Sequence, residues 1–359
     1  MTKRTRKLPN LGLDRFSGVY LWVVFVVIFT IWSPQIFPTM STVHSVASQQ
    51  AIGGMLAIAV LIPLACGCFD LSVGATANLT GITATLLQVN KHWGVWYAIL
   101  ASVAVGMIIG VINGFVVVKL RVSSFIATLG AGSILSAVLI IITNSVQPQP
   151  ATSSTWTNLT QVSVGGFQIV VLYLLILAVL AWWFLEFTPA GRYIHATGGN
   201  AEAARLSGVR VNKWSWVTLI LSGTIAGIAG VLYTSQTGPS LSFGPGLLLP
   251  AFAAAFLGST QLRPGRFNVW GTLIAIFVLA TGVEGLEIVS GQQWLNDMFN
   301  GVALILAVAL AVSRERSLAG GRGDYSGEVA PEDPPGDVAD EKSSGQVSAV
   351  GGSGGPTRH

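Results

Sequence analysis

The sequence contains very little charge. Of its 359 residues only 9% are Asp, Glu, Lys or Arg and 52% are hydrophobic, whereas a soluble domain carries about 25% charged residues. Residues 16–69 and 122–185 contain none of these four residue types. Hydrocarbon about 30 Å thick needs roughly 20 apolar residues per helix, so the longest charge-free stretches hold two crossings each. This composition indicates a polytopic membrane protein.

Cysteine is also scarce. Cys66 and Cys68 lie one residue apart inside an apolar run. In a helix they would face opposite sides, which suits neither a disulfide nor a metal site. We therefore expect them to be small packing residues.

The usual signatures of catalysis are missing. The sequence shows no Ser, His and Asp arrangement, no metal-ligand constellation and no GxxxxGK[ST] phosphate loop. The glycine-rich stretch 198–200 lacks the lysine of such a loop. We expect no catalytic residue, metal or cofactor, and any ATP-driven step requires another polypeptide. The net charge of +4 does not indicate a nucleic-acid partner, because the basic residues are scattered singly through loops.

The apolar runs predict an all-α transmembrane bundle of about ten spans. The predicted crossings are 19–37, 51–69, 71–89, 95–118, 124–143, 167–187, 214–235, 246–262, 267–286 and 297–313. An even number places both termini on one side. The lysines and arginines identify that side as the cytoplasm, because fifteen of the sixteen up to Arg316 fall in alternate segments and only Lys91 falls in an outer one.

The predicted domains follow from this topology. A basic cytoplasmic N-terminus, 1–18, precedes the transmembrane domain, 19–313, with a cytoplasmic loop at 188–213. No small-residue cleavage site follows the basic N-terminus, so we expect this N-terminus to be retained and not removed as a signal peptide. Residues 314–359 are rich in Gly, Pro, Ser and acidic residues, which predicts a disordered cytoplasmic tail.

The loop TGGNAEAARLSGVRVNKW (197–214) is polar and basic in a mostly apolar chain. Asn200 suits the N-cap of a short helix, Glu202 suits its first turn, and Gly208 suits a left-handed C-terminal position. A rigid helix between two spans would let a partner move those spans. An ordinary solvated loop remains the alternative.

Asp70, in CGCFDLSVGATAN, lies between two apolar runs, where a carboxylate must avoid lipid. It either sits in a tight turn at the cytoplasmic end of the second span or caps a broken helix that lines a pathway. We favour a structural break that shapes the pathway. Weaker polar candidates are Asn113, Glu284, Glu287, Asp297 and His44.

Two further features have open interpretations. The charge-free segment 144–166 is the largest predicted outer loop, and it either faces an external partner or is a plain connection. Small residues recur every four positions from Ala98 to Gly114, and again between Ser222 and Gly230. Such stripes let helices approach closely in lipid. We favour packing within the chain over a dimer seam.

Four motifs together resemble a known family. They are FDLSVG (69–74), NG with the following KLR (113–121), FIATLG (125–130) and GGNAEAARLSG (198–208). In this order, over about residues 45–313, the chain resembles the monosaccharide-type permease subunits of bacterial ABC importers, the ribose, xylose and galactose group. These are relatives of the branched-chain amino-acid permeases. EAA with a glycine four residues after its last Ala matches the cytoplasmic EAA loop of ABC importers.

The resemblance implies a coupling helix that docks into a cleft on the ATPase. The implied docking residues are Gly199, Asn200, Glu202, Ala203, Ala204 and Gly208. It also implies three partners: a second permease copy or sister permease, a tandem ABC ATPase subunit, and an extracytoplasmic sugar-binding protein. The implied location of the protein is the bacterial cytoplasmic (inner) membrane. We assign the substrate pathway to Asp70, Ser72, Asn113 and Thr128.

The implied mechanism is ATP-driven alternating access for a monosaccharide. The chain departs from the family in LLPAFAAAFLGSTQLRPGRFN (248–268), where Pro250 stands at a commonly acidic position and Arg263 lies in a usually glycine-rich loop. The alternatives are a branched-chain amino-acid permease and an ion-coupled secondary transporter. The scarcity of charges within the spans disfavours the secondary transporter.

Overall fold

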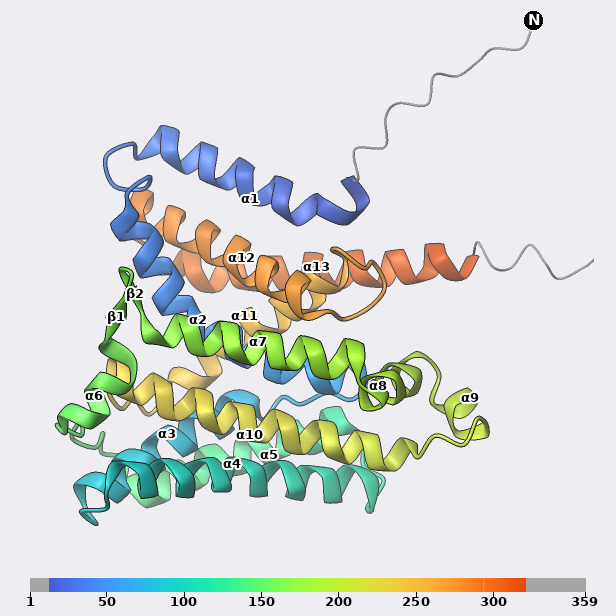
Figure 1. The fold of residues 1–359 in the computed structure, drawn as a ribbon, viewed down its shortest axis with the longest axis horizontal. Coiled ribbons are helices and arrows are strands. Elements are labelled where there is room, and N and C mark those ends of the chain that lie inside the picture. Colours follow the sequence, from blue (N-terminus) through green and yellow to red (C-terminus); the bar gives the residue numbers. More distant parts are fainter. Residues whose placement is uncertain (1–12, 293, 321–359) are drawn as a thin grey trace, which may run out of the picture. The chain divides into compact units, whose positions relative to one another are not determined.

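The computed structural model describes the backbone of residues 13–292 and 294–320 and the side chains of residues 16–292 and 294–313. Within these residues the fold is all-helical, as predicted, except for one very short hairpin (Figure 1). The helices form one compact unit that ends at Leu318. The predicted disorder of the tail falls largely on residues 321–359, which lie outside the described part of the chain.

Ten long helices follow the predicted crossings. They are α1 (Leu13–Trp32), α2 (Met40–Ala65), α3 (Val73–Val89), α4 (Val95–Val118), α5 (Ser124–Thr143), α7 (Ile169–Phe187), α10 (Val211–Thr237), α11 (Phe243–Ser259), α12 (Val269–Ser290) and α13 (Trp294–Gly320). The connections add α6 (Ser154–Gln161), strands β1 (Ser163–Val164) and β2 (Phe167–Gln168), α8 (Pro189–Gly199) and α9 (Ala201–Leu206).

Seven of these helices are long and apolar enough to cross a membrane: α2, α4, α5, α7, α10, α12 and α13. Two shorter apolar helices, Phe16–Trp32 and Phe243–Ser259, lie within α1 and α11, and α3 has 17 residues. At 1.5 Å per residue a 17-residue helix is about 25 Å long, near the lower limit for a crossing. Each predicted crossing overlaps one of the ten helices.

The second predicted span differs most from its helix. It was expected at 51–69, but α2 begins at Met40, because the Thr39 hydroxyl caps it by accepting a hydrogen bond from the backbone N of Thr42 (3.3 Å). The helix ends at Ala65, because Gly67 has a φ of +81°.

The early end of α2 corrects the expected placement of the cysteines. Since the backbone has left the helix, Cys66 and Cys68 do not face opposite sides of it. The Cys66 thiol instead lies 4.0 Å from the hydroxyl of Ser215 on α10. Both side chains are buried, as packing residues should be.

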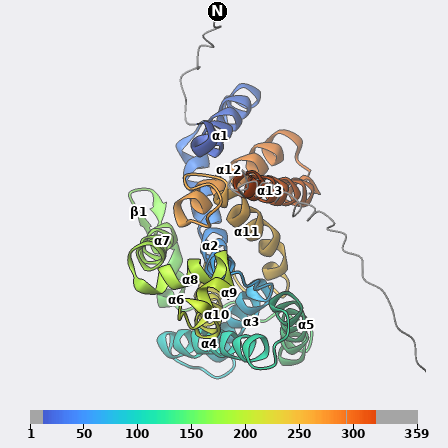
Figure 2. The same cartoon turned by 90° about the vertical axis from the view of Figure 1, so that its right-hand side faces the viewer.

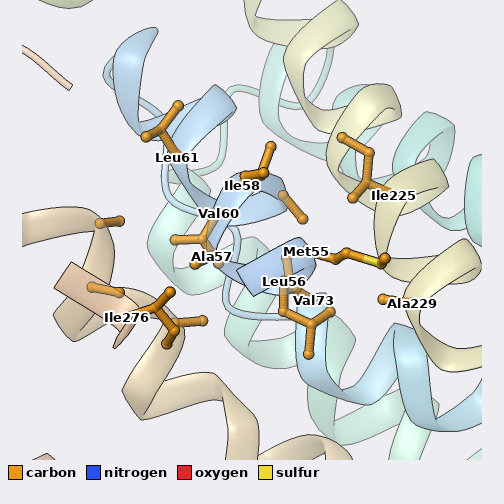
Figure 3. Close-up of a cluster of buried hydrophobic side chains, with 14 of the residues drawn as sticks. Met55, Leu56, Ala57, Ile58, Val60, Leu61, Val73, Ile225, Ala229 and Ile276 are labelled. Carbon is orange, nitrogen blue, oxygen red and sulfur yellow. The ribbon is translucent and has the colours of Figure 1, made fainter. Parts of the chain in front are cut away.

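Helix α2 lies at the centre of the unit. All of its residues from Ala51 to Ala65 are buried, and it packs against α7, α10, α11 and α12 (Figure 2). Figure 3 shows Met55, Ile58 and Leu56 of α2 between Ile225 of α10 and Ile276 of α12. A helix that is apolar on every side is stable only when other helices surround it, which explains its central position.

The small-residue stripes pack against each other within the chain. A methyl group added at Gly106 of α4 would overlap the carbonyl oxygen of Gly223 of α10, and one added at Gly223 would overlap that of Gly106. Only glycine permits backbones this close. The stripes therefore form an internal α4–α10 seam, as favoured from the sequence.

The segment predicted to be the largest outer loop folds onto α10. The Trp156 side chain of α6 is buried, and the backbone carbonyl oxygen of Trp156 accepts a hydrogen bond from the Ser235 hydroxyl (2.6 Å). Beyond it, Gln236 donates to the side chain of Gln168 on β2 (2.7 Å). The sequence predicted a loop here, and it missed the helix, the hairpin and this anchoring.

Candidate functional site

The cytoplasmic loop predicted at 188–213 contains two helices, of which α9 is the more exposed. Asn200 caps α9, because its side-chain oxygen accepts a hydrogen bond from the backbone N of Ala203 (2.9 Å). Glu202 lies in the first turn, and both of its carboxylate oxygens accept hydrogen bonds from Arg205 (2.7 Å each). The Asn200 cap, the position of Glu202 and its pairing with Arg205 together stabilise the first turn of a helix only six residues long.

The other end of α9 is closed by a Schellman motif. Gly208 has a φ of +83° and donates to the carbonyl of Arg205 (3.0 Å), while Val209 donates to the carbonyl of Ala204 (3.0 Å). The Ala204 side chain is buried, whereas Leu206 is 82% exposed. The loop therefore presents a rigid helix with an apolar side chain that nothing in the described part of the chain covers.

Helix α8 connects α9 to the bundle. Its first turn is capped by Thr188, which accepts from the backbone N of Gly191 (3.2 Å). At its other end, a methyl group added at Gly198 would overlap the carbonyl oxygen of Ala65, the last residue of α2, whereas one added at Gly199 would meet nothing within 4 Å. The α8 terminus that leads into α9 is therefore seated against the end of the central helix (Figure 2).

Charged residues form ion pairs where α7 ends and α8 begins. Glu186, at the end of α7, forms ion pairs with Arg263 and with Arg266 (3.7 Å). His195 of α8 lies close to this group. Burial, followed by the positive charges of Arg266 and Arg263 and opposed by Glu186, lowers the pKa of His195 to about 4. His195 is therefore neutral near pH 7 and adds no charge to this surface.

The four residues assigned to the substrate pathway are brought together at the break between α2 and α3. Asp70 is fully buried, and its Oδ1 accepts hydrogen bonds from the backbone N (3.1 Å) and the hydroxyl (2.6 Å) of Ser72. Asn113 of α4 donates to the same hydroxyl (2.8 Å). On α10, Ser222 faces the carboxylate without reaching hydrogen-bond geometry.

Helix α5 holds the backbone of the same break. The Thr128 hydroxyl accepts from the backbone N of Leu71 (3.0 Å), and the Ser124 hydroxyl accepts from the backbone N of Phe69 (3.0 Å). The two hydroxyls satisfy donors that the missing helical turn leaves without partners. Asp70 thus lies in the break between α2 and α3, which α4 and α5 hold by hydrogen bonds.

The sequence of the chain matches a family model over residues 42–308. The model describes the permease component of branched-chain amino acid transport systems. The chain belongs to this permease family. With its long apolar helices it is a multi-pass protein of the bacterial cytoplasmic membrane.

Individual relatives of the permease are named for other solutes. The ribose import permease protein of Escherichia coli (strain K12) is 30% identical over 300 residues, which cover 82% of this chain and 92% of the relative. The D-allose transport system permease protein of the same strain is 30% identical, with 83% and 91% covered. The autoinducer 2 import system permease protein of Salmonella choleraesuis (strain SC-B67) is 30% identical, with 81% and 84% covered.

The weaker sequence candidates lie apart from the α2–α3 break of the permease. Glu287 of α12 accepts a hydrogen bond from Asn296 of α13 (3.3 Å), and the His44 ring packs edge-on against Phe167 at 4.4 Å. Glu284 lies one turn before Glu287, and Asp297 lies in the first turn of α13.

Sequence reasoning missed the ion pairs of Glu186 and the close contact of Gly198 with the backbone of Ala65. Both join residues far apart in the chain, and no local signal marks either contact.

Proposed function

We propose that the chain is the transmembrane permease subunit of an ATP-binding cassette importer that carries a monosaccharide. The observation that carries this proposal is α9, a doubly capped, exposed helix seated through α8 on the central helix. The relatives named for ribose and allose import support a sugar over a branched-chain amino acid.

In this proposal the ten helices cross the membrane and both termini are cytoplasmic. A tandem ATPase subunit docks on Gly199, Asn200, Glu202, Ala203, Ala204 and Gly208. The permease works as a pair of identical or sister subunits, and an extracytoplasmic binding protein delivers the sugar. The chain itself hydrolyses no ATP.

The mechanism is alternating access. Closure of the ATPase pair moves α9, and α8 passes the displacement to the end of α2 through the contact at Gly198. The break that begins there contains Ser72, which accepts a hydrogen bond from Asn113 of α4, and Leu71, which donates one to Thr128 of α5. A small displacement of this break therefore moves α2, α3, α4 and α5 together. Interfaces between packed helices switch between discrete arrangements. We place Asp70, Ser72, Asn113 and Thr128 beside the pathway, where they position its helices.

The test is co-purification from the native membrane, followed by an ATPase assay. We expect a tandem nucleotide-binding subunit to accompany the permease, and its hydrolysis to be stimulated by a binding protein loaded with one sugar. That sugar identifies the substrate. A permease that arrives alone and shows ion-driven flux in vesicles would contradict the proposal.

A further inference from the structure

A polar hollow of about 380 Å³ lies where α4 ends and α10 begins, two helix ends that are side by side (Figure 1). It is lined by residues from the end of α4, the turn that follows it and the first two turns of α10: Val118, Lys119, Arg121, Asn212, Lys213 and Trp216. Three of these six residues are cations. We refer to this site as the α4–α10 hollow.

The three cations of the hollow, Lys119, Arg121 and Lys213, have no counter-charge. The ion pairs among residues 16–292 and 294–313 all use arginines of α9 and of the α11–α12 connection. Lys213 lies over the ring of Trp214, 5.1 Å from its centroid, which leaves its charge unneutralised. The first turn of α10 contains no acidic residue and has no side-chain cap, so the helix dipole adds to the positive potential. The hollow therefore attracts an anion.

The hollow lies at the depth of lipid headgroups. Helix α4 has 24 residues, so it is about 36 Å long, slightly longer than the roughly 30 Å of hydrocarbon in a bilayer. The end of α4 therefore reaches the membrane–water interface, where tryptophan is enriched. Trp216 is fixed at the wall of the hollow, because its indole N donates a hydrogen bond to the carbonyl of Val111 (3.1 Å).

An exposed apolar face of α4 leads to the hollow. Ile108, Ile112 and Phe115 are exposed, and their spacing of four and three residues places them on one face of the helix. Lys119 follows Phe115 by four residues and so lies at the end of the same face. From Ile108 to Lys119 the helix rises about 16 Å, close to the hydrocarbon thickness of one leaflet, about 15 Å. A soluble anion would leave this face bare, whereas a phospholipid acyl chain would cover it.

We propose that the α4–α10 hollow binds the phosphodiester headgroup of an anionic phospholipid, whose acyl chain lies along the exposed face of α4. Lys119 and Lys213 neutralise the phosphate, and the Arg121 guanidinium donates hydrogen bonds to its oxygens. Basic pockets between membrane helices bind such headgroups in other proteins. A bound lipid joins the end of α4 to the first turn of α10. This binding requires no ATPase and does not depend on the proposed transport function.

The test measures equilibrium binding of radiolabelled dioleoyl phosphatidylglycerol to the purified full-length permease, immobilised in neutral detergent without ATPase. Unlabelled dioleoyl phosphatidylcholine, which has the same acyl chains and no net charge, is the competitor for comparison. We expect saturable binding of phosphatidylglycerol, at least fivefold tighter than that of phosphatidylcholine. The preference should shrink in 0.5 M NaCl, because salt screens the attraction between the cations and the phosphate.

Charge-removing variants locate the binding site. Lys119→Gln with Lys213→Gln should weaken phosphatidylglycerol binding at least fivefold and leave phosphatidylcholine binding unchanged. The matched control, Lys91→Gln with Arg192→Gln, removes two exposed cations that do not line the hollow, and its affinity should stay within twofold of the native value. Arg121→Gln removes no ion pair of the fold and should weaken binding in the same direction, so it repeats the test if the lysine variant does not fold.

Four results would overturn the proposal. Equal losses in the two double variants would show attraction to the overall charge of the permease and no site. Equal affinity for the two lipids would show that the headgroup is not recognised. Competition by glycerophosphoglycerol, which has the headgroup but no acyl chains, as effective as that by phosphatidylglycerol would assign the hollow to a soluble anion. Absence of saturable lipid binding would leave the exposed face of α4 to a second copy of the chain. A failure of the proposed transport function would change none of these measurements.

Discussion

At the scale of single residues, Asp70 shows how a buried carboxylate can serve as a structural element. Its Oδ1 satisfies both the backbone N and the hydroxyl of Ser72, and that hydroxyl accepts from Asn113. The three groups form one chain of hydrogen bonds between the α2–α3 break and α4. The hydrogen bonds require an acceptor at Oδ1, and the charge is not needed to form them.

We therefore predict different outcomes for two substitutions of Asp70. Asp70→Leu leaves two buried donors of Ser72 without an acceptor, at about 1–3 kcal/mol each, and should lower the yield of folded permease several-fold. Asp70→Asn keeps an oxygen at Oδ1 and should stay within about twofold of the native yield. Size-exclusion chromatography of detergent extracts measures both. Equal yields for the two variants would show that the acceptor is not required.

At the scale of elements, the sequence predicted what local chemistry determines. The cap at Asn200, the left-handed Gly208 and the ten apolar segments are each encoded by a few neighbouring residues, and the structure contains all of them. The gathering of Ser72, Asn113 and Thr128 around one break depends on packing between helices. The sequence analysis assigned them to one substrate pathway but predicted no contact among them, and their hydrogen bonds required the structure. The end of α2 was misplaced, because hydropathy continues through Cys66 and Cys68 while the backbone turns away at Gly67.

A matched pair of glycines tests the contact between α8 and α2. Gly198→Ala places a methyl group on the backbone of Ala65, whereas Gly199→Ala places one in open space. Gly198→Ala should lower the apparent melting temperature of the detergent-solubilised permease by several degrees, and Gly199→Ala should leave it nearly unchanged. Similar melting temperatures would mean that α8 is free to shift and is not seated on α2.

A charge exchange separates the internal role of Glu202 from its proposed role in docking. Glu202→Lys breaks the pair with Arg205 and should uncouple transport from ATP hydrolysis, while the protein remains inserted in the membrane. Adding Arg205→Glu restores an opposite-charge pair at the same spacing. An exposed pair at this spacing contributes only about 0.3–0.5 kcal/mol.

If Glu202 contacts the ATPase, the double variant should remain uncoupled, with less than about a tenth of native uptake. Recovery of uptake in the double variant would assign Glu202 to helix stability alone. Unchanged uptake in Glu202→Lys would contradict the coupling role of α9 itself.

At the scale of the whole molecule, the two ends of the bundle have different chemistry. The end with α8 and α9 carries Lys119, Arg210 and Lys213 and the arginines that pair with Glu186. The opposite end carries α6 and the β1–β2 hairpin, whose hydrogen bonds to α10 use the uncharged side chains of Gln168, Ser235 and Gln236 (Figure 1). Positive residues remain on the cytoplasmic side during insertion, so this asymmetry predicts that α9 faces the cytoplasm and that the hairpin faces the outside.

Labelling of single cysteines tests this orientation. In a background with Cys66→Ser and Cys68→Ser, Val164→Cys lies on the hairpin and Leu206→Cys lies on α9, where the native side chains are 59% and 82% exposed. A membrane-impermeant maleimide should label Val164→Cys in intact cells and Leu206→Cys only after the membrane is opened. Labelling of both from the same side would require an even number of crossings between them, whereas α7 is the one long helix that joins the hairpin to α8. That result would remove α7 from the membrane and α9 from the reach of a cytoplasmic ATPase.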